Sequence, residues 1–116
     1  MNPSVSLARP GDIAVGPFPF TDLTGSKRRP VLILAVVNRD DCVVAFITSR
    51  PQPDGFDNIL ISSDDPEFAQ TRLVTASTIR LGRLATLHSS VFLGRLGRIG
   101  PSTQARVSEG LRLLFP

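Results

Sequence analysis

Short apolar segments interrupted by glycine, proline and aspartate are the feature that most constrains the fold of this chain. Ten of its 116 residues are proline and nine are glycine, and the longest apolar stretch runs only from Pro30 to Val37. Segments of this length that are rich in β-branched residues are typical of strands, because helices need longer periodic segments. The expected strands are 13–15, 30–37, 42–47, 58–61, 72–81 and 93–99.

The connections between these segments predict which strands pair. Residues 38–41 form a four-residue turn, so 30–37 and 42–47 are expected to make an antiparallel hairpin. The polar stretch 21–29 and the acidic stretch 62–70 are expected to be loops. A mostly antiparallel sheet follows from this arrangement.

The C-terminal end of the chain changes to a helical pattern. Val107, Leu111 and Leu114 fall on one face of a helix, and Pro101 suits its first turn, with Ser102 as the competing cap. The sequence therefore predicts a mostly β fold with a C-terminal helix, in the form of a small barrel or half-barrel.

Size and composition indicate one globular domain. We expect a single domain over residues 1–116, with 1–9 as a loose N-terminal segment. The chain has no apolar run long enough for a membrane span and no signal peptide pattern, so we expect a cytoplasmic protein without membrane contact. Cys42 is the single cysteine, and no Cys/His cluster has ligand spacing, so neither a metal nor another cofactor is expected.

Basic residues are unevenly distributed along the chain. Residues 1–70 carry six basic and nine acidic residues, whereas residues 71–116 carry seven arginines and a single acidic residue, Glu109. Such asymmetry favours a polyanionic partner, and the planar guanidinium group is well suited to phosphate. A solvated basic surface, or pairing with the acidic half of the chain, is the alternative explanation.

Two segments combine groups that can bind phosphate. Lys27, Arg28 and Arg29 precede Pro30, whose ring fixes the backbone at the start of a buried strand. At the end of the next strand, residues 47–50 supply two hydroxyls and a guanidinium. The structural alternatives are a basic gatekeeper against aggregation for the first segment and a Ser/Thr turn for the second.

Other polar residues have simpler structural interpretations. His88 titrates near neutral pH, but no neighbouring feature supports a catalytic role. Cys42 lies in an apolar strand and is expected in the core. The acidic cluster Asp64, Asp65 and Glu67 lacks the ligand spacing of a cation site and is expected to be a solvated loop.

Five segments occur in a recognisable order over roughly residues 10–115. They are 11–13, 28–34, 45–49, 78–84 and 95–99. In this order they resemble the MazF/PemK/Kid toxins: an N-terminal Gly-Asp-Ile, an Arg-Pro before an apolar strand, a strand ending in threonine, an Ile-Arg segment and a closing strand before a helix. Thr78 stands where the family frequently has glutamine.

The resemblance implies an SH3-like small barrel of the CcdB/MazF type that forms a homodimer. It also implies a growth-inhibiting toxin that cleaves single-stranded RNA, such as mRNA, at specific sequences without a metal ion, through attack by the substrate's own 2′-hydroxyl. A cognate antitoxin with an acidic C-terminal segment is the implied partner, and DNA is contacted only through the antitoxin complex.

The same resemblance assigns catalytic roles to Arg29 and Thr48. The residues expected to bind RNA are Arg28, Ser49, Arg50, Thr78 and Arg80. A guanidinium can stabilise charge on a phosphate and a hydroxyl can hold it in place, but neither is a natural general base. Asp22 and His88 are the candidate general acid and base.

A non-catalytic protein on the same barrel is the alternative. A CcdB-like toxin that acts on another protein, or a barrel that only binds RNA, would tolerate the loss of Arg29 and Thr48. A ribonuclease would not tolerate that loss.

Overall fold

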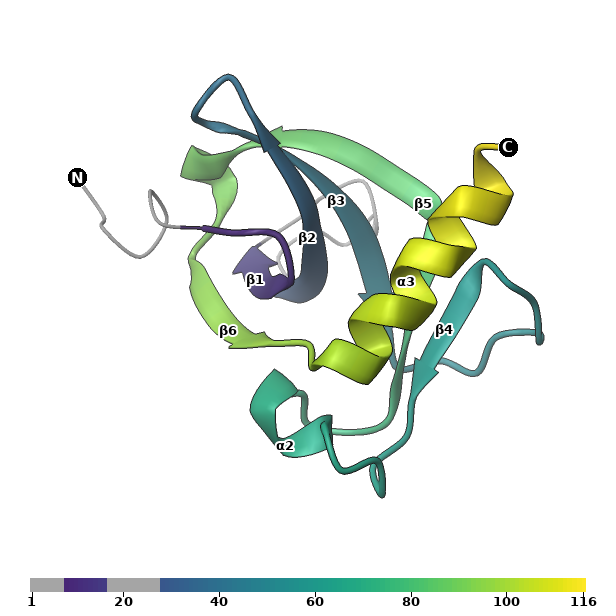
Figure 1. Cartoon of the computed structure of the whole chain (residues 1–116). Helices are drawn as coiled ribbons and strands as arrows, with labels where there is room; N and C mark the ends of the chain where they lie inside the picture. Colours follow the sequence, from purple (N-terminus) through teal and green to yellow (C-terminus); the bar gives the residue numbers. More distant parts are fainter. Residues whose placement is uncertain (1–7, 17–27) are drawn as a thin grey trace.

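A strongly curved antiparallel sheet with one long helix beside it forms the computed structural model, which describes residues 8–16 and 28–116 (Figure 1). The sheet order is β4-β5-β3-β2-β1-β6. Its strands are β1 (Asp12–Gly16), β2 (Arg29–Val37), β3 (Asp41–Thr48), β4 (Asn58–Ile61), β5 (Ser77–His88) and β6 (Gly94–Arg98). The helices are α2 (Phe68–Thr71) and α3 (Pro101–Leu114), and η2 (Ser89–Val91) is a single 3-10 turn.

The predicted mostly β fold with a C-terminal helix is confirmed, and so is the hairpin of β2 and β3. Residues 21–27 of the expected loop 21–29 lie outside the described residues, as does most of the segment 1–9, and Arg29 at the end of that loop belongs to β2 instead. None of the helices in the described part of the chain is long and apolar enough to cross a membrane.

The expected strand 72–81 is wrong at both ends, because β5 begins at Ser77 and continues to His88. The register between β3 and β5 shifts at one point: Ala45 pairs with Leu84, whereas Phe46 pairs with Arg80. A bulge of this kind bends a strand without ending it. Gly82 falls within the bulge, so a glycine that interrupts the sequence pattern does not interrupt the strand.

Apolar residues are buried on both faces of the curved sheet. Leu32, Ile47 and Ile79 belong to one core cluster, which also contains Val107 of α3. The other face buries Val31, Ile33, Cys42, Val44 and Phe92. Cys42 lies in the core as expected, and burial, followed by the nearby Asp41 and Asp40 carboxylates, raises the pKa of its thiol.

The first turn of α3 is capped by a residue that is distant in sequence. The Glu67 carboxylate accepts hydrogen bonds from the backbone N–H groups of Ser102 (2.9 Å) and Thr103 (3.0 Å). Pro101 lies in the first turn of α3 as expected, whereas the competing cap, Ser102, is wrong, because Gly100 holds the cap position and no side chain there makes a cap hydrogen bond. Glu67 is also not the solvated loop residue that was expected.

Gly100 makes this long-range cap possible. A Cβ atom at Gly100 would lie 2.3 Å from the carboxyl carbon of Glu67, closer than any real contact of that kind. The carboxylate can therefore reach the start of α3 only because residue 100 has no side chain. The contact of Glu67 with Ser102 and Thr103 holds the acidic stretch 62–70 against the start of α3.

Glu67→Gln is expected to lower the free energy of unfolding at neutral pH. As the pH falls, the variant should lose less of this free energy than the wild type does. The Ser102 and Thr103 N–H groups hold the pKa of Glu67 below its ordinary value of 4.5. A carboxylate whose pKa is lower in the folded state than in the unfolded state stabilises the fold in full at pH values above its unfolded-state pKa. This stabilisation is lost as the pH falls through its folded-state pKa. Denaturant unfolding from about pH 7 to about pH 3 measures the difference between the two proteins.

Glu109→Gln is the matched control, because Glu109 is an exposed carboxylate on α3 that pairs with Arg112. Exposed pairs of this kind contribute little, so this variant should follow the wild-type curve more closely than Glu67→Gln does. Parallel curves for wild type and Glu67→Gln over the acid range would contradict the capping role.

Candidate functional site

A groove lies where β2 begins and β3 ends. Val31 pairs with Phe46, and the same register continued by two residues sets Arg29 beside Thr48. We call this groove, of about 300 Å³, the arginine groove. Its lining comprises Val15, Arg28, Arg29, Pro30, Ile47, Thr48, Ser49, Leu73, Val74, Thr75, Ser77 and Leu96. Four of the residues singled out in the sequence, Arg28, Arg29, Thr48 and Ser49, thus line one space.

The two arginines of this groove differ in their surroundings. Arg29 begins β2, pairs with Gly16 of β1, and is half-buried, with its Nε shielded from solvent. Arg28 precedes the strand and is exposed. The sheet therefore holds Arg29 in place, whereas Arg28 forms a charged rim.

The Thr48 hydroxyl has one hydrogen bond within the turn that follows β3. Its Oγ1 accepts the backbone N–H of Arg50 at 3.1 Å, which is the Ser/Thr turn considered from the sequence. A hydroxyl carries one proton and two lone pairs, so this bond leaves the proton available for a ligand. Thr48 therefore has a structural bond and still offers a donor.

The chemistry of the arginine groove suits an anion. Its described lining contributes two guanidinium groups and several hydroxyls, and includes neither a carboxylate nor an imidazole. Guanidinium and hydroxyl donors are typical ligands of phosphate oxygens. Within the described ranges, no group of three or more His, Cys, Asp or Glu side chains gathers as it would around a metal ion.

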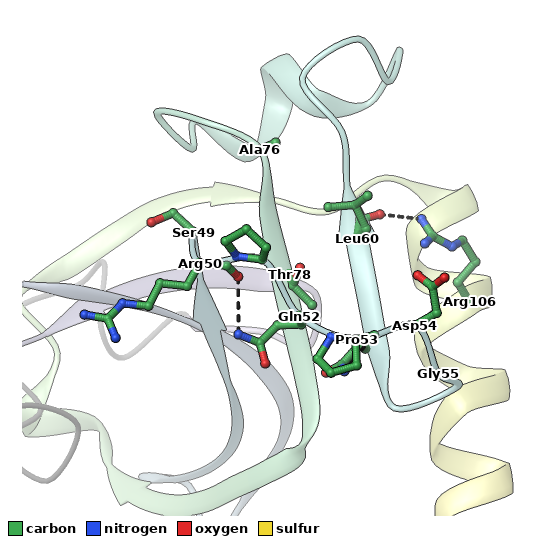
Figure 2. A pocket seen from close by; sticks show the side chains of 12 residues that line it. Ser49, Arg50, Gln52, Pro53, Asp54, Gly55, Leu60, Ala76, Thr78 and Arg106 are labelled. Carbon is green, nitrogen blue, oxygen red and sulfur yellow. Dashed lines mark hydrogen bonds between the residues drawn. The ribbon is translucent and has the colours of Figure 1, made fainter.

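A second hollow, of about 380 Å³, lies beside the groove and is lined by the loop after β3 (Figure 2). We call it the proline hollow, after Pro51 and Pro53. Its lining comprises residues 49–55, Asn58, Leu60, Ala76, Thr78 and Arg106. Arg50 and Thr78 were expected to bind RNA from the sequence, but Asn58 and Arg106 were not expected at any site. No local pattern could identify them, because they come from β4 and α3.

Two of the residues considered from the sequence lie elsewhere. Arg80 lies between Phe46 and Asn58 in the sheet and lines neither space. His88 pairs with Asp41 at the far end of β5, whereas Thr48 pairs with Thr78 near its start. The candidate acid–base role of His88 therefore has no support from its position.

His88 instead caps η2, since its Nδ1 accepts the backbone N–H of Ser90 at 3.1 Å. Asp22, the other candidate acid or base, lies outside the described residues.

The arginines of the C-terminal half do not gather at the groove. Arg95 and Arg98 of β6 pair with the buried carboxylate of Asp12, at 3.1 and 2.9 Å. Arg112 pairs with Glu109 within α3. Pairing with the acidic half of the chain, the alternative considered from composition, thus accounts for Arg95 and Arg98, and a pair within α3 accounts for Arg112.

The chain matches one family model, described as the PemK-like, MazF-like toxin of type II toxin–antitoxin systems, over residues 9–115. No curated protein sequence matches the chain.

Several solved structures have the same fold. The Mycobacterium tuberculosis toxin MazF-mt6 is 18% identical, with 90% of this chain and 95% of that chain covered and a TM-score of 0.69. An endoribonuclease in complex with its cognate antitoxin, from a mycobacterial species, is 16% identical, with coverages of 93% and 94% and a TM-score of 0.70. A mycobacterial endoribonuclease is 18% identical, with coverages of 93% and 90% and a TM-score of 0.67.

Proposed function

The chain belongs to the family of PemK-like, MazF-like toxins of type II toxin–antitoxin systems, and on this premise we propose that it cleaves single-stranded RNA at specific sequences without a metal ion. Two of the solved structures with this fold are named endoribonucleases. The observation that carries the proposal is that Arg29 and Thr48, on different strands, line one groove with donors suited to phosphate.

The proposed reaction uses the 2′-hydroxyl of the substrate as the nucleophile. Its oxygen forms a bond to the adjacent phosphorus and loses a proton, and the bond from phosphorus to the 5′-oxygen breaks. The departing oxygen takes up a proton, so the products carry a 2′,3′-cyclic phosphate and a 5′-hydroxyl. The protein has to stabilise extra negative charge on phosphorus and to move these two protons.

Arg29 and Thr48 have complementary roles in this scheme. The half-buried guanidinium of Arg29 is held by the sheet, and it binds the phosphate oxygens on which charge develops. The Thr48 hydroxyl, positioned by its bond to the Arg50 N–H, donates its proton to a phosphate oxygen and holds the reacting group in line. The cationic lining binds the phosphate directly, without an intervening metal ion.

The proton acceptor comes from outside this pair. Neither a guanidinium nor a threonine hydroxyl is a natural base near neutral pH. The described lining of the groove adds no carboxylate or imidazole, and His88 lies at the far end of β5. Of the two candidates named from the sequence, Asp22 and His88, we propose Asp22, which lies outside the described residues, as the base.

The purified chain is expected to cut long single-stranded RNA at a few sites in the presence of EDTA. The fragments should carry 5′-hydroxyl ends, so a polynucleotide kinase should label them without prior phosphatase treatment. Sequencing of the labelled ends measures the site preference. Folded protein that leaves several long RNAs intact, or that cuts only after Mg²⁺ is added, would contradict the proposal.

Arg29→Lys is expected to slow single-turnover cleavage by about 10²–10³-fold, because an ammonium group cannot reproduce the two-pronged contact of a guanidinium. Arg28→Lys is the matched control, and the exposed position of Arg28 predicts a change of only a few fold. Arg28→Ala should mainly raise the apparent substrate constant.

A slower Arg28→Lys enzyme would reverse the assignment of the two arginines. Full growth arrest by both Arg29→Ala and Thr48→Ala would instead favour the non-catalytic alternative, a CcdB-like toxin or an RNA-binding barrel.

A homodimer and an antitoxin with an acidic C-terminal segment are the partners we propose from family membership. Arg28 and Arg50 are exposed beside the groove and offer charges to an acidic peptide. Inhibition by such a peptide should weaken steeply as salt rises, because exposed charges are screened within about 8 Å at physiological ionic strength. Inhibition constants measured at increasing salt concentration test the acidic antitoxin segment. Light scattering of the free chain measures its mass and tests the homodimer. Salt-independent inhibition or a monomer would overturn the respective proposal.

A further inference from the structure

The proline hollow is placed where a neighbour of the cleaved phosphate would lie. Thr48 lines the arginine groove and Thr78 lines the hollow, and these two residues are register partners on adjacent strands. Adjacent strands are about 4.8 Å apart. Ser49 lines both spaces, so the hollow and the groove are neighbours at that residue. An RNA strand held by its phosphate in the groove therefore has the hollow within reach of its next base.

Part of the lining of the hollow is apolar. Pro51, Pro53, Ala76 and Leu60 contribute this surface, and the side chain of Leu60 is open, with 53% of its surface exposed. Sites for small planar molecules combine such apolar surface with a few fixed polar groups. The flat faces of a nucleobase match this surface.

Three side chains of the hollow, Gln52, Asp54 and Asn58, carry acceptor oxygens. The Asn58 side-chain nitrogen donates to the Pro53 carbonyl at 2.9 Å. The Gln52 nitrogen donates to the Arg50 carbonyl at 3.3 Å (Figure 2). Each bond turns an amide nitrogen to the loop backbone and leaves the amide oxygen for a ligand. The Asp54 carboxylate accepts no hydrogen bond and forms no ion pair within the described residues.

The two guanidinium groups of the lining point partly to other groups. Arg106 donates its Nη1 to the Leu60 carbonyl at 2.9 Å, and the side chain of Arg50 extends away from the other lining side chains (Figure 2). The Asp54 carboxylate and the two amide oxygens are therefore acceptors that a ligand in the hollow can use. Uracil offers a single ring N–H between two carbonyl oxygens, whereas adenine, cytosine and guanine each carry an exocyclic amino group.

We propose that the proline hollow is the subsite that reads the base beside the cleaved phosphate, and that it selects bases with an exocyclic amino group against uracil. This inference rests on the proposed ribonuclease function. Acceptor oxygens of the hollow that face uracil oxygens gain no hydrogen bond, whereas an exocyclic amino group donates to them, and this difference favours the amino-bearing bases. Asp54 is the residue with the largest expected effect, because its carboxylate can only accept.

The test measures binding separately from cleavage. Short oligouridines with 2′-fluoro sugars lack the attacking hydroxyl, so the full-length chain binds them without cutting them. One position at a time is changed to adenine, cytosine or guanine, and fluorescence anisotropy gives each Kd. At one position the amino-bearing bases should bind on the order of tenfold more tightly than uracil. Asp54→Asn should remove most of this preference, since an amide also donates.

Asp40→Asn is the matched control, because Asp40 is an exposed carboxylate in the β2–β3 turn, away from the hollow, and should leave the preference unchanged. Equal binding of all four bases, or an unchanged preference in Asp54→Asn, would overturn the inference. Cleavage of unmodified RNA is measured in parallel. Cleavage without base selection in binding overturns only the subsite, and base selection without cleavage overturns only the nuclease function.

Discussion

The alternation of Ile47 and Thr48 at the end of β3 is the constraint on which the candidate site depends. Ile47 is buried in the core cluster that contains Val107 of α3, so Thr48 has to face the opposite side of the sheet. Because β3 is paired on both edges, its register cannot shift by one residue without moving Ile47 out of the core. Packing of apolar residues thus sets Thr48 between Arg29 on one side and Thr78 on the other.

The distribution of charge along the chain differs from its distribution in space. The seven arginines beyond residue 70 suggest a basic C-terminal half, but Arg95 and Arg98 surround the buried Asp12 carboxylate and hold β6 against β1. The guanidinium groups that line the arginine groove come instead from Arg28 and Arg29, in the half of the chain that is acidic overall. The position of an arginine in the folded sheet and its acidic partners, rather than the charge of its half of the chain, therefore decide whether it lines the groove.

Sequence patterns predicted the parts of this structure that local periodicity controls. The β2–β3 hairpin and the helical face of α3 follow from short stretches of chain, and the family motifs singled out Arg29 and Thr48, which the register brings to one groove. The features that were not predicted depend on contacts between distant residues. Glu67 caps α3 from 35 residues away, and Arg106 reaches the hollow from α3. No spacing rule identifies such pairs.

Arg106 also has a consequence for the solubility of the folded chain. β4 is an edge of the sheet, and an edge strand exposes backbone groups to which a strand from another molecule can add. The guanidinium of Arg106 occupies the outward carbonyl of Leu60 and places a charge beside the exposed apolar side chain of that residue. Helix α3 therefore covers a backbone carbonyl of β4 to which a strand of another copy could hydrogen-bond. This protection against aggregation exists only after α3 has packed against the sheet.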